Sequence, residues 1–163
     1  MNILIATDAD WVVDDVTAAL GTDDVTFTIC REGRVVAGQV AETVPDLAIL
    51  DMQIGSMGGM AVTMSLRLDE SSGTLPHVPI LMLLDRAADL HLARRSGAEG
   101  WLIKPLDSLR LKRAAKAILA GDTYTEGVPK PAVVTPETPA DGEAGGPTDE
   151  ATESSEEEPV TAG

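Results

Sequence analysis

The chain is poor in cysteine, histidine and aromatic residues, and it has no long apolar run. Its single cysteine, Cys30, has no partner for a disulfide within the chain, and with only His77 and His91 beside it the sequence offers no set of zinc ligands. No apolar stretch approaches the ~18 to 20 residues of a membrane span, and the N-terminus lacks the basic start of a secretory signal. These absences predict a cytoplasmic protein that does not depend on disulfides, zinc or a membrane.

Aromatic residues make up only 2% of the 163 residues, although 44% of the residues are hydrophobic. A core can therefore form, and it must consist of Leu, Val, Ile, Ala and Met. The length is typical of one domain with an appendage.

The net charge of −15 is unevenly distributed along the chain. From Gly121 onward there are eleven acidic residues and one basic residue, Lys130, so residues 1–120 carry a net charge of only −5. The acidic stretch is rich in Pro, Gly, Ser, Thr and Glu and has no apolar period, so it buries too little surface to offset its ordering entropy. We therefore predict one folded domain over residues 1–122 and a disordered acidic tail over residues 123–163. The tail is a solubilising appendage or, alternatively, a docking segment for a basic surface.

The first part of the chain alternates short apolar runs with segments of helical spacing. Strands are predicted for the apolar runs, at residues 2–6, 25–29, 46–51, 79–84 and 101–103. Helices are predicted between and after them, at residues 10–20, 35–43, 60–68 and 90–96 and around Leu111, Ala115 and Ile118. This alternation predicts an α/β fold with a doubly wound parallel sheet of five strands, covered on both faces.

Three charged side chains stand at the ends of predicted strands. Asp8 follows the first strand, Asp51 ends the third and Lys104 follows the fifth. Ligands bind outside the carboxyl ends of the strands in such sheets, so we expect the three to meet there. Two carboxylates hold Mg²⁺, a lysine contacts phosphate oxygens, and a carboxylate can itself accept a phosphoryl group. Each residue alone has a structural explanation, as a helix cap, an ion-pair partner or an exposed strand end, and their convergence favours a phosphoryl-transfer site.

Two segments resemble response regulator receiver domains. Residues 45–52 (PDLAILDM) with 55–59 (GSMGG) resemble the phosphoacceptor segment of that family, and residues 97–105 (GAEGWLIKP) resemble its last strand and lysine–proline turn. The resemblance covers residues 1–120. It implies the flavodoxin-like receiver fold, with strand order 2-1-3-4-5.

The resemblance also implies a role for each residue of the site. Asp51 would accept the phosphoryl group, and Lys104 would contact it. The side chains of Asp8 and Asp51 and the backbone carbonyl of Gln53 would bind Mg²⁺. The lysine–proline bond is usually cis in the family, so the bond before Pro105 is expected to be cis.

Four positions depart from the family pattern. Thr7 replaces the first of two adjacent acids, which is expected to weaken metal binding, and Gly55 replaces a proline in the loop after the phosphoacceptor. Leu84 replaces the serine or threonine whose hydroxyl binds the phosphoryl group, and Asp85 replaces a small residue and adds negative charge nearby. Trp101 keeps the aromatic position that moves on activation, yet without the hydroxyl this coupling lacks its first step.

These observations predict a stand-alone, non-enzymatic receiver protein of a two-component phosphorelay. It would take a phosphoryl group from a sensor histidine kinase or phosphotransfer protein. It would contact a downstream protein through its fourth helix, fifth strand and fifth helix, since no effector domain is expected beyond them. The alternatives are a non-phosphorylated pseudo-receiver that acts as a constitutive adaptor or complex subunit and, more weakly, a flavin or nucleotide binder. The acidic charge without a basic groove argues against nucleic-acid binding.

Overall fold

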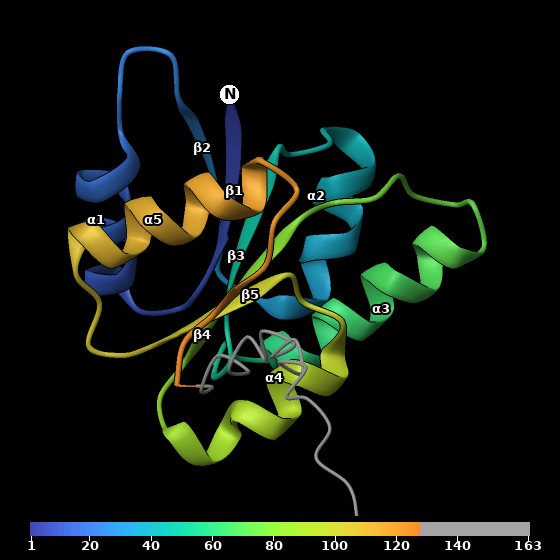
Figure 1. The fold of residues 1–163 in the computed structure, drawn as a ribbon. Helices are drawn as coiled ribbons and strands as arrows, with labels where there is room; N and C mark the ends of the chain where they lie inside the picture. Colours follow the sequence, from blue (N-terminus) through green and yellow to red (C-terminus); the bar gives the residue numbers. More distant parts are fainter. Residues whose placement is uncertain (128–163) are drawn as a thin grey trace, which may run out of the picture. The chain divides into compact units, whose positions relative to one another are not determined.

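The computed structural model describes residues 1–127, and their strands form one parallel sheet (Figure 1). The strands are β1 (Asn2–Ala6), β2 (Thr26–Cys30), β3 (Leu47–Asp51), β4 (Ile80–Leu84), β5 (Gly100–Ile103) and β6 (Tyr124–Thr125). Their order in the sheet is β2-β1-β3-β4-β5-β6, and every neighbouring pair is parallel. The predicted fold class and the order of the first five strands are confirmed.

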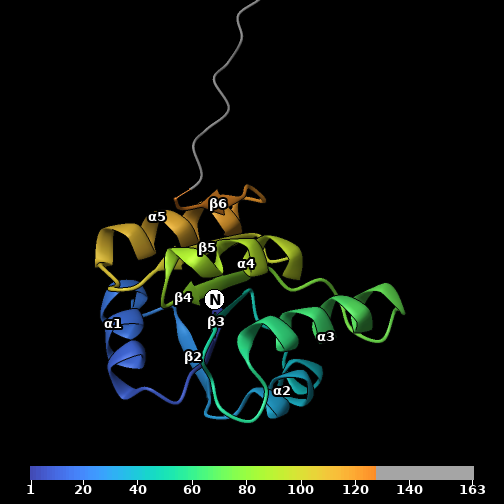
Figure 2. The ribbon, with the colours of Figure 1, turned by 90° about the horizontal axis from the view of Figure 1, so that it is seen from below.

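Helices connect the strands and cover both faces of the sheet. The α-helices are α1 (Asp10–Leu20), α2 (Val36–Glu42), α3 (Gly59–Ser71), α4 (Leu90–Ser96) and α5 (Ser108–Leu119). Short 3₁₀ turns, η1 (Gly33–Val35) and η2 (Ala87–Asp89), lead into α2 and α4. Helices α1 and α5 pack on one face, and α2, α3 and α4 pack on the other (Figure 2). Within residues 1–127 no helix is both long enough and apolar enough to cross a membrane.

The two faces of the central strands explain why their sequences are apolar throughout. In β1, Ile3 and Ile5 face α1 and α5, whereas Leu4 and Ala6 face α2 and α3. Every residue of β3 and β4 is buried, as expected for parallel strands covered on both sides. The core consists mainly of Leu, Ile, Val, Ala and Met, as the composition predicts.

The sixth strand is the main difference from the predicted fold. The chain leaves α5 at Gly121, whose φ of 83° suits a glycine, and returns along the outer edge of β5. Tyr124 pairs with Gly100, although residues 123–163 were predicted to be a disordered tail. A strand of two residues has no detectable apolar period, so composition alone did not reveal it. The rest of the predicted tail, residues 128–163, lies outside the described residues.

Candidate functional site

Parallel register brings the predicted residues to one edge of the sheet. Ala6 lies beside Leu50, so the residues after β1 reach the end of β3, where Asp51 stands. β5 lies two strands away, across β4, and places Lys104 just past its end. Asp51 and Lys104, which are 53 residues apart in the chain, are thereby brought into contact.

The carboxylate of Asp51 is buried and fully engaged. Only 2% of the residue is exposed. Lys104 Nζ lies 2.8 Å from its Oδ1 and 3.0 Å from its Oδ2. The backbone N–H of Gln53 donates to Oδ1 at 3.1 Å, and the hydroxyl of Thr7 donates to Oδ2 at 2.9 Å. Burying a carboxylate is costly unless a cation and hydrogen bonds compensate it, and here both do so.

Thr7 is the residue of this site that sequence analysis missed. It appeared only as the loss of an acid, yet its side chain is completely buried beside Asp51. Its Oγ1 donates to Asp51 and accepts a hydrogen bond from the backbone N–H of Ala9 at 3.2 Å. The sequence indicated only its place, because the residue directly after β1 lies near the end of β3 in a doubly wound sheet. It gave no sign that the side chain there would donate to Asp51.

Asp85 contacts the lysine as well. Its Oδ1 lies 3.1 Å from Lys104 Nζ, and 36% of its side chain is exposed. The lysine therefore bridges a buried carboxylate, Asp51, and a half-exposed one. On its remaining side its Nζ lies 5.5 Å from the ring centroid of Trp11, within reach of a cation–π contact.

The donor atoms at this edge are oxygen atoms, as Mg²⁺ prefers. Asp8 is exposed, and its Oδ2 lies 3.5 Å from the position that a Cβ on Gly55 would take, so the loop after β3 passes close to this carboxylate. Within residues 1–127 no cluster of three or more His, Cys, Asp or Glu side chains is arranged around a metal position. A cation here would therefore be held by few side chains, together with backbone oxygen and water.

The two predicted switch positions lie behind the site, in the core. Leu84 is fully buried and belongs with Trp101, Met82 and Ala93 to a cluster under α4. Only 4% of Trp101 is exposed, and its Nε1 donates to the backbone carbonyl of Glu126 at 2.9 Å. The Lys104–Pro105 bond is cis, as the resemblance implies.

The remaining reactive side chains do not join this site. Burial raises the pKa of the Cys30 thiol, which keeps it protonated and unreactive. His77 lies against Glu70, with 2.9 Å between Nδ1 and Oε1. Burial raises the pKa of Glu70, but hydrogen bonds and positive charge from His77 and Arg67 outweigh it and lower that pKa. Within residues 1–127 the ring of His91 hydrogen-bonds the carbonyl of Ala88, just before its own helix.

Comparison with known proteins agrees with this geometry. The family model of the response regulator receiver domain matches residues 3–116. The chain is 28% identical over 112 residues to the response regulator PleD of Caulobacter vibrioides. The aligned region covers 68% of this chain but only 24% of PleD. It is 27% identical over 120 residues to the protein PilH of Pseudomonas aeruginosa, covering 74% of this chain and 98% of PilH.

Solved structures give the same result. A putative response regulator from Chloroflexus aurantiacus superposes with a TM-score of 0.65 at 26% identity, covering 73% of this chain and 97% of that one. The chemotaxis response regulator CheY4 of Vibrio cholerae, at 21% identity and a TM-score of 0.63, shares the fold. The chain spans about a quarter of PleD and nearly all of PilH. Because the family model covers more than half of the chain, this protein belongs to the response regulator receiver domain family, and thus to two-component signalling.

Proposed function

We propose that this receiver domain accepts a phosphoryl group on Asp51 and signals by protein–protein contact. The observation that carries the proposal is the position of Lys104 Nζ, within 3.0 Å of both oxygens of a buried strand-end carboxylate. Phosphoryl transfer needs a positioned nucleophile and positive charge on the equatorial oxygens, and little else from the protein. Asp51 supplies the first and Lys104 the second.

The expected donor is the phosphohistidine of a sensor histidine kinase or phosphotransfer protein. A carboxylate oxygen of Asp51 attacks phosphorus, the phosphorus–nitrogen bond breaks, and the imidazole leaves with the electron pair and takes a proton from solvent. The hydrogen bonds from Thr7 and Gln53 fix the plane of the carboxylate before the attack. Lys104 then follows the new charge from the carboxylate to a phosphoryl oxygen.

Mg²⁺ is the cofactor that the donor atoms suit. The side chains of Asp8 and Asp51 and the backbone carbonyl of Gln53 would hold it. When bound, the ion neutralises charge on the phosphoryl oxygens. Asp8 is a single acid where the family pattern has two, so weak metal binding is expected.

We expect the downstream protein to bind the surface formed by α4, β5 and α5. Helices α4 and α5 carry six basic residues, of which Arg110 is already paired with Glu126: Arg94, Arg95, Arg110, Lys112, Arg113 and Lys116. Leu84, at the end of β4, has no hydroxyl that could couple this surface to the site. The hydroxyl that donates to Asp51 belongs to Thr7, which follows β1 on the other side of β3.

One observation favours a second candidate, the non-phosphorylated adaptor. Asp85 holds Lys104 in competition with Asp51, and a negative charge next to the site opposes the arrival of a phosphoryl group. In this alternative the buried ion pair is purely structural, and partners recognise one fixed state.

The test uses the full chain with phosphoramidate as donor, in Mg²⁺ and in excess EDTA, followed by intact-mass analysis. We expect wild type to gain one phosphoryl group that hydroxylamine removes, and Asp51→Asn to gain none. Asp15→Asn, an exposed acid on α1, is the matched control and should be labelled like wild type. Absence of labelling in wild type, with a labelled receiver domain as positive control, would support the adaptor.

A further inference from the structure

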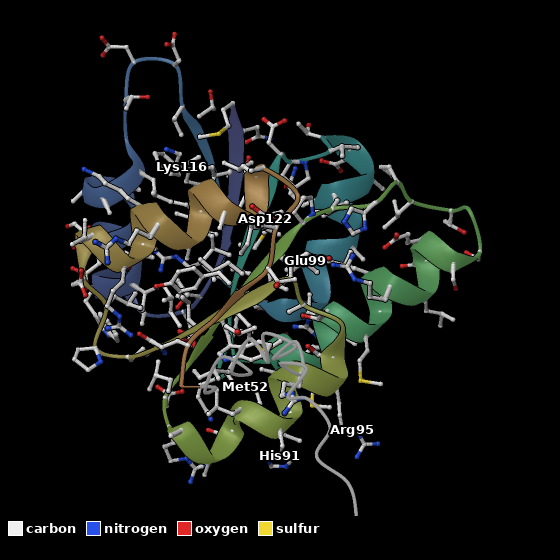
Figure 3. The ribbon with its side chains drawn as sticks, viewed as in Figure 1. Met52, His91, Arg95, Glu99, Lys116 and Asp122 are labelled. Atoms are coloured by element: carbon white, nitrogen blue, oxygen red, sulfur yellow. The ribbon has the colours of Figure 1, made fainter. Side chains whose placement is uncertain are left out.

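The outer edge of β5 is covered by the chain itself. Residues 122–127, the C-terminal strap, follow the turn at Gly121 and run parallel to β5 (Figures 2 and 3). The backbone N–H of Tyr124 donates to the carbonyl of Glu99 at 3.1 Å. A Cβ on Gly100 would lie 2.6 Å from the carbonyl oxygen of Tyr124, so this close approach requires a glycine there. The strap thus occupies the place where a further strand would pair.

Glu126 is the anchor of the strap. Its Oε2 accepts a hydrogen bond from the backbone N–H of Ile103 at 2.8 Å, and its backbone carbonyl accepts one from Trp101 Nε1 at 2.9 Å. Its carboxylate therefore satisfies an edge N–H beyond the two paired residues of β6. A single residue holds the backbone of β5 and the ring of Trp101 at the same time.

Arg110 recognises the glutamate through two nitrogens. Its Nε donates to Glu126 Oε1 at 2.7 Å, and its Nη2 contacts Oε2. The same guanidinium donates to the carbonyls of Pro105 at 2.8 Å and Ile103 at 2.8 Å, so the end of β5 holds it in place. The hydrogen bond that Arg110 donates to Glu126 raises the pKa of Arg110, against the effect of burial. A guanidinium fixed in this way is a site for one carboxylate in one orientation.

The last residue of the strap packs into the space between α4 and β5. Gly127 has a φ of 74°, and a Cβ there would lie 3.3 Å from Leu90 and 3.5 Å from Ile103. The strap therefore ends against the apolar side chains of Leu90 and Ile103, and a residue larger than glycine would crowd them.

We propose that the edge of β5 is a strand-accepting site for an extended acidic peptide, and that the C-terminal strap is its built-in occupant. An extended peptide that adds to a sheet edge gains affinity from backbone hydrogen bonds and specificity from side-chain pockets. Here the pocket is the fork of Arg110, so a competing peptide needs a glutamate at the position of Glu126. The strap can leave because its strand pairs through only two residues and the side chain of Glu126 is 25% exposed. When it leaves, Arg110 loses the carboxylate of Glu126 and the N–H of Ile103 loses its acceptor, and a peptide with a glutamate at that position restores both. None of the residues proposed for phosphoryl transfer takes part, so this proposal and phosphorylation of Asp51 fail independently. It rests on the proposed downstream surface only in sharing β5 and Arg110 with it.

The first measurement is amide and indole hydrogen exchange of the full chain. In Glu126→Ala we expect the Ile103 amide to exchange about tenfold faster or more, because its hydrogen bond to the carboxylate is lost. The Trp101 indole N–H should also exchange faster, because the backbone carbonyl that it donates to lies on a strap no longer anchored by Arg110. Glu42→Ala, on α2, is the matched control: in the described part of the chain its carboxylate accepts a hydrogen bond from Gln39 alone, at 3.4 Å, and protection should not change. Unchanged protection in Glu126→Ala would overturn the strap as the closure of this edge.

The second measurement adds a synthetic peptide with the sequence of residues 120–129 (AGDTYTEGVP). Millimolar peptide should restore protection of the Ile103 amide in the Glu126→Ala chain, and a peptide with alanine in place of glutamate should not. Wild type should bind the labelled peptide at least about tenfold more weakly than Glu126→Ala, because its own strap competes. A folded Glu126→Ala chain, shown by unchanged exchange in β1 and β3, that ignores the peptide would overturn the acceptor site. Equal binding of both peptides would overturn the role of Arg110.

Discussion

Two acid–base pairs stand at different places on the same sheet, and they differ in burial and in the base that is used. Asp51 pairs with Lys104 at the carboxyl ends of the strands, with side chains only 3% and 10% exposed. Glu126 pairs with Arg110 at the β5 edge, with side chains 25% and 26% exposed. The first acid ends a rigid central strand, whereas the second lies on a short terminal strap.

The comparison teaches what each pair is suited to do. Lysine is a point charge with freely rotating donors, so Lys104 can follow charge from a carboxylate to a phosphoryl oxygen. The guanidinium of arginine is planar and donates through two parallel N–H groups. Arg110 therefore selects a carboxylate in one orientation and is poorly suited to a group whose geometry changes during a reaction. Burial makes the first pair costly to break, and exposure makes the second easy to exchange.

Removing the base of the buried pair has the largest expected effect. Lys104→Met leaves Asp51 without its cation, so the free energy of unfolding at neutral pH should fall by about 3 kcal/mol. Urea denaturation measures this loss. The control is Arg31→Met, which breaks the exposed pair with Asp10 and should cost less than about 1 kcal/mol. Equal losses would show that Asp51 is not held as a buried charge.

Thr7→Val tests the hydroxyl that sequence analysis missed. Valine keeps the shape but leaves Asp51 one donor short and the Ala9 N–H without its acceptor, so we expect a loss of about 1 to 2 kcal/mol. Phosphorylation of Asp51 should also slow about tenfold, because the carboxylate is less well oriented. Thr7→Ser should restore both. Thr63→Val removes another buried hydroxyl, one that bonds only to the Gly59 carbonyl, and should leave the phosphorylation rate unchanged.

Arg110→Met breaks the pair at the β5 edge. Since both partners are partly exposed, the expected loss of stability is about 1 kcal/mol, smaller than for Lys104→Met. Urea denaturation of the two variants side by side measures the difference directly. Arg113→Met, an exposed arginine on the same helix that forms no ion pair within residues 1–127, should be neutral. A loss for Arg110→Met as large as that for Lys104→Met would contradict the difference in burial.

Asp85→Ala has the smallest expected effect. It frees Lys104 from its half-exposed second carboxylate and should raise the initial rate of phosphorylation by phosphoramidate about two- to threefold. Asp15→Ala removes an exposed acid from α1 with the same change in net charge and is the control. A rate that rises equally in both variants would assign the effect to net charge and not to the contact with Lys104.

Much of the fold was readable because its signals are local. The apolar runs at residues 2–6, 46–51 and 79–84 are strands buried on both faces, and such strands need no partner to be recognised. Charged residues at strand ends, Asp51 and Lys104, then predicted where the sheet would collect its polar side chains, and the structure brings these two together. Asp8 lies at the same end, and its part in metal binding remains a prediction.

The contacts that characterise this site were not readable, because each joins residues that local patterns do not relate. The hydroxyl of Thr7 meets a carboxylate 44 residues away, and Lys104 meets Asp85 19 residues away. The predicted start of the disordered tail, at residue 123, was wrong for a related reason. Acidic composition predicts disorder on average, but Glu126 is held by Arg110 and by the backbone of Ile103, and only a folded sheet provides those partners.

The sequence by itself determined five of the six strands, the five helices and the acid and base at the strand ends, because periodicity and strand-end position are properties of the chain. The order of those five strands followed from the resemblance to receiver domains. Only the tertiary structure decided which hydroxyl orients Asp51, which second acid holds Lys104, and that six residues after α5 close the β5 edge. Those outcomes depend on distances between elements, and hydrogen bonds and ion pairs weaken too steeply with distance and angle for spacing along the chain to predict them.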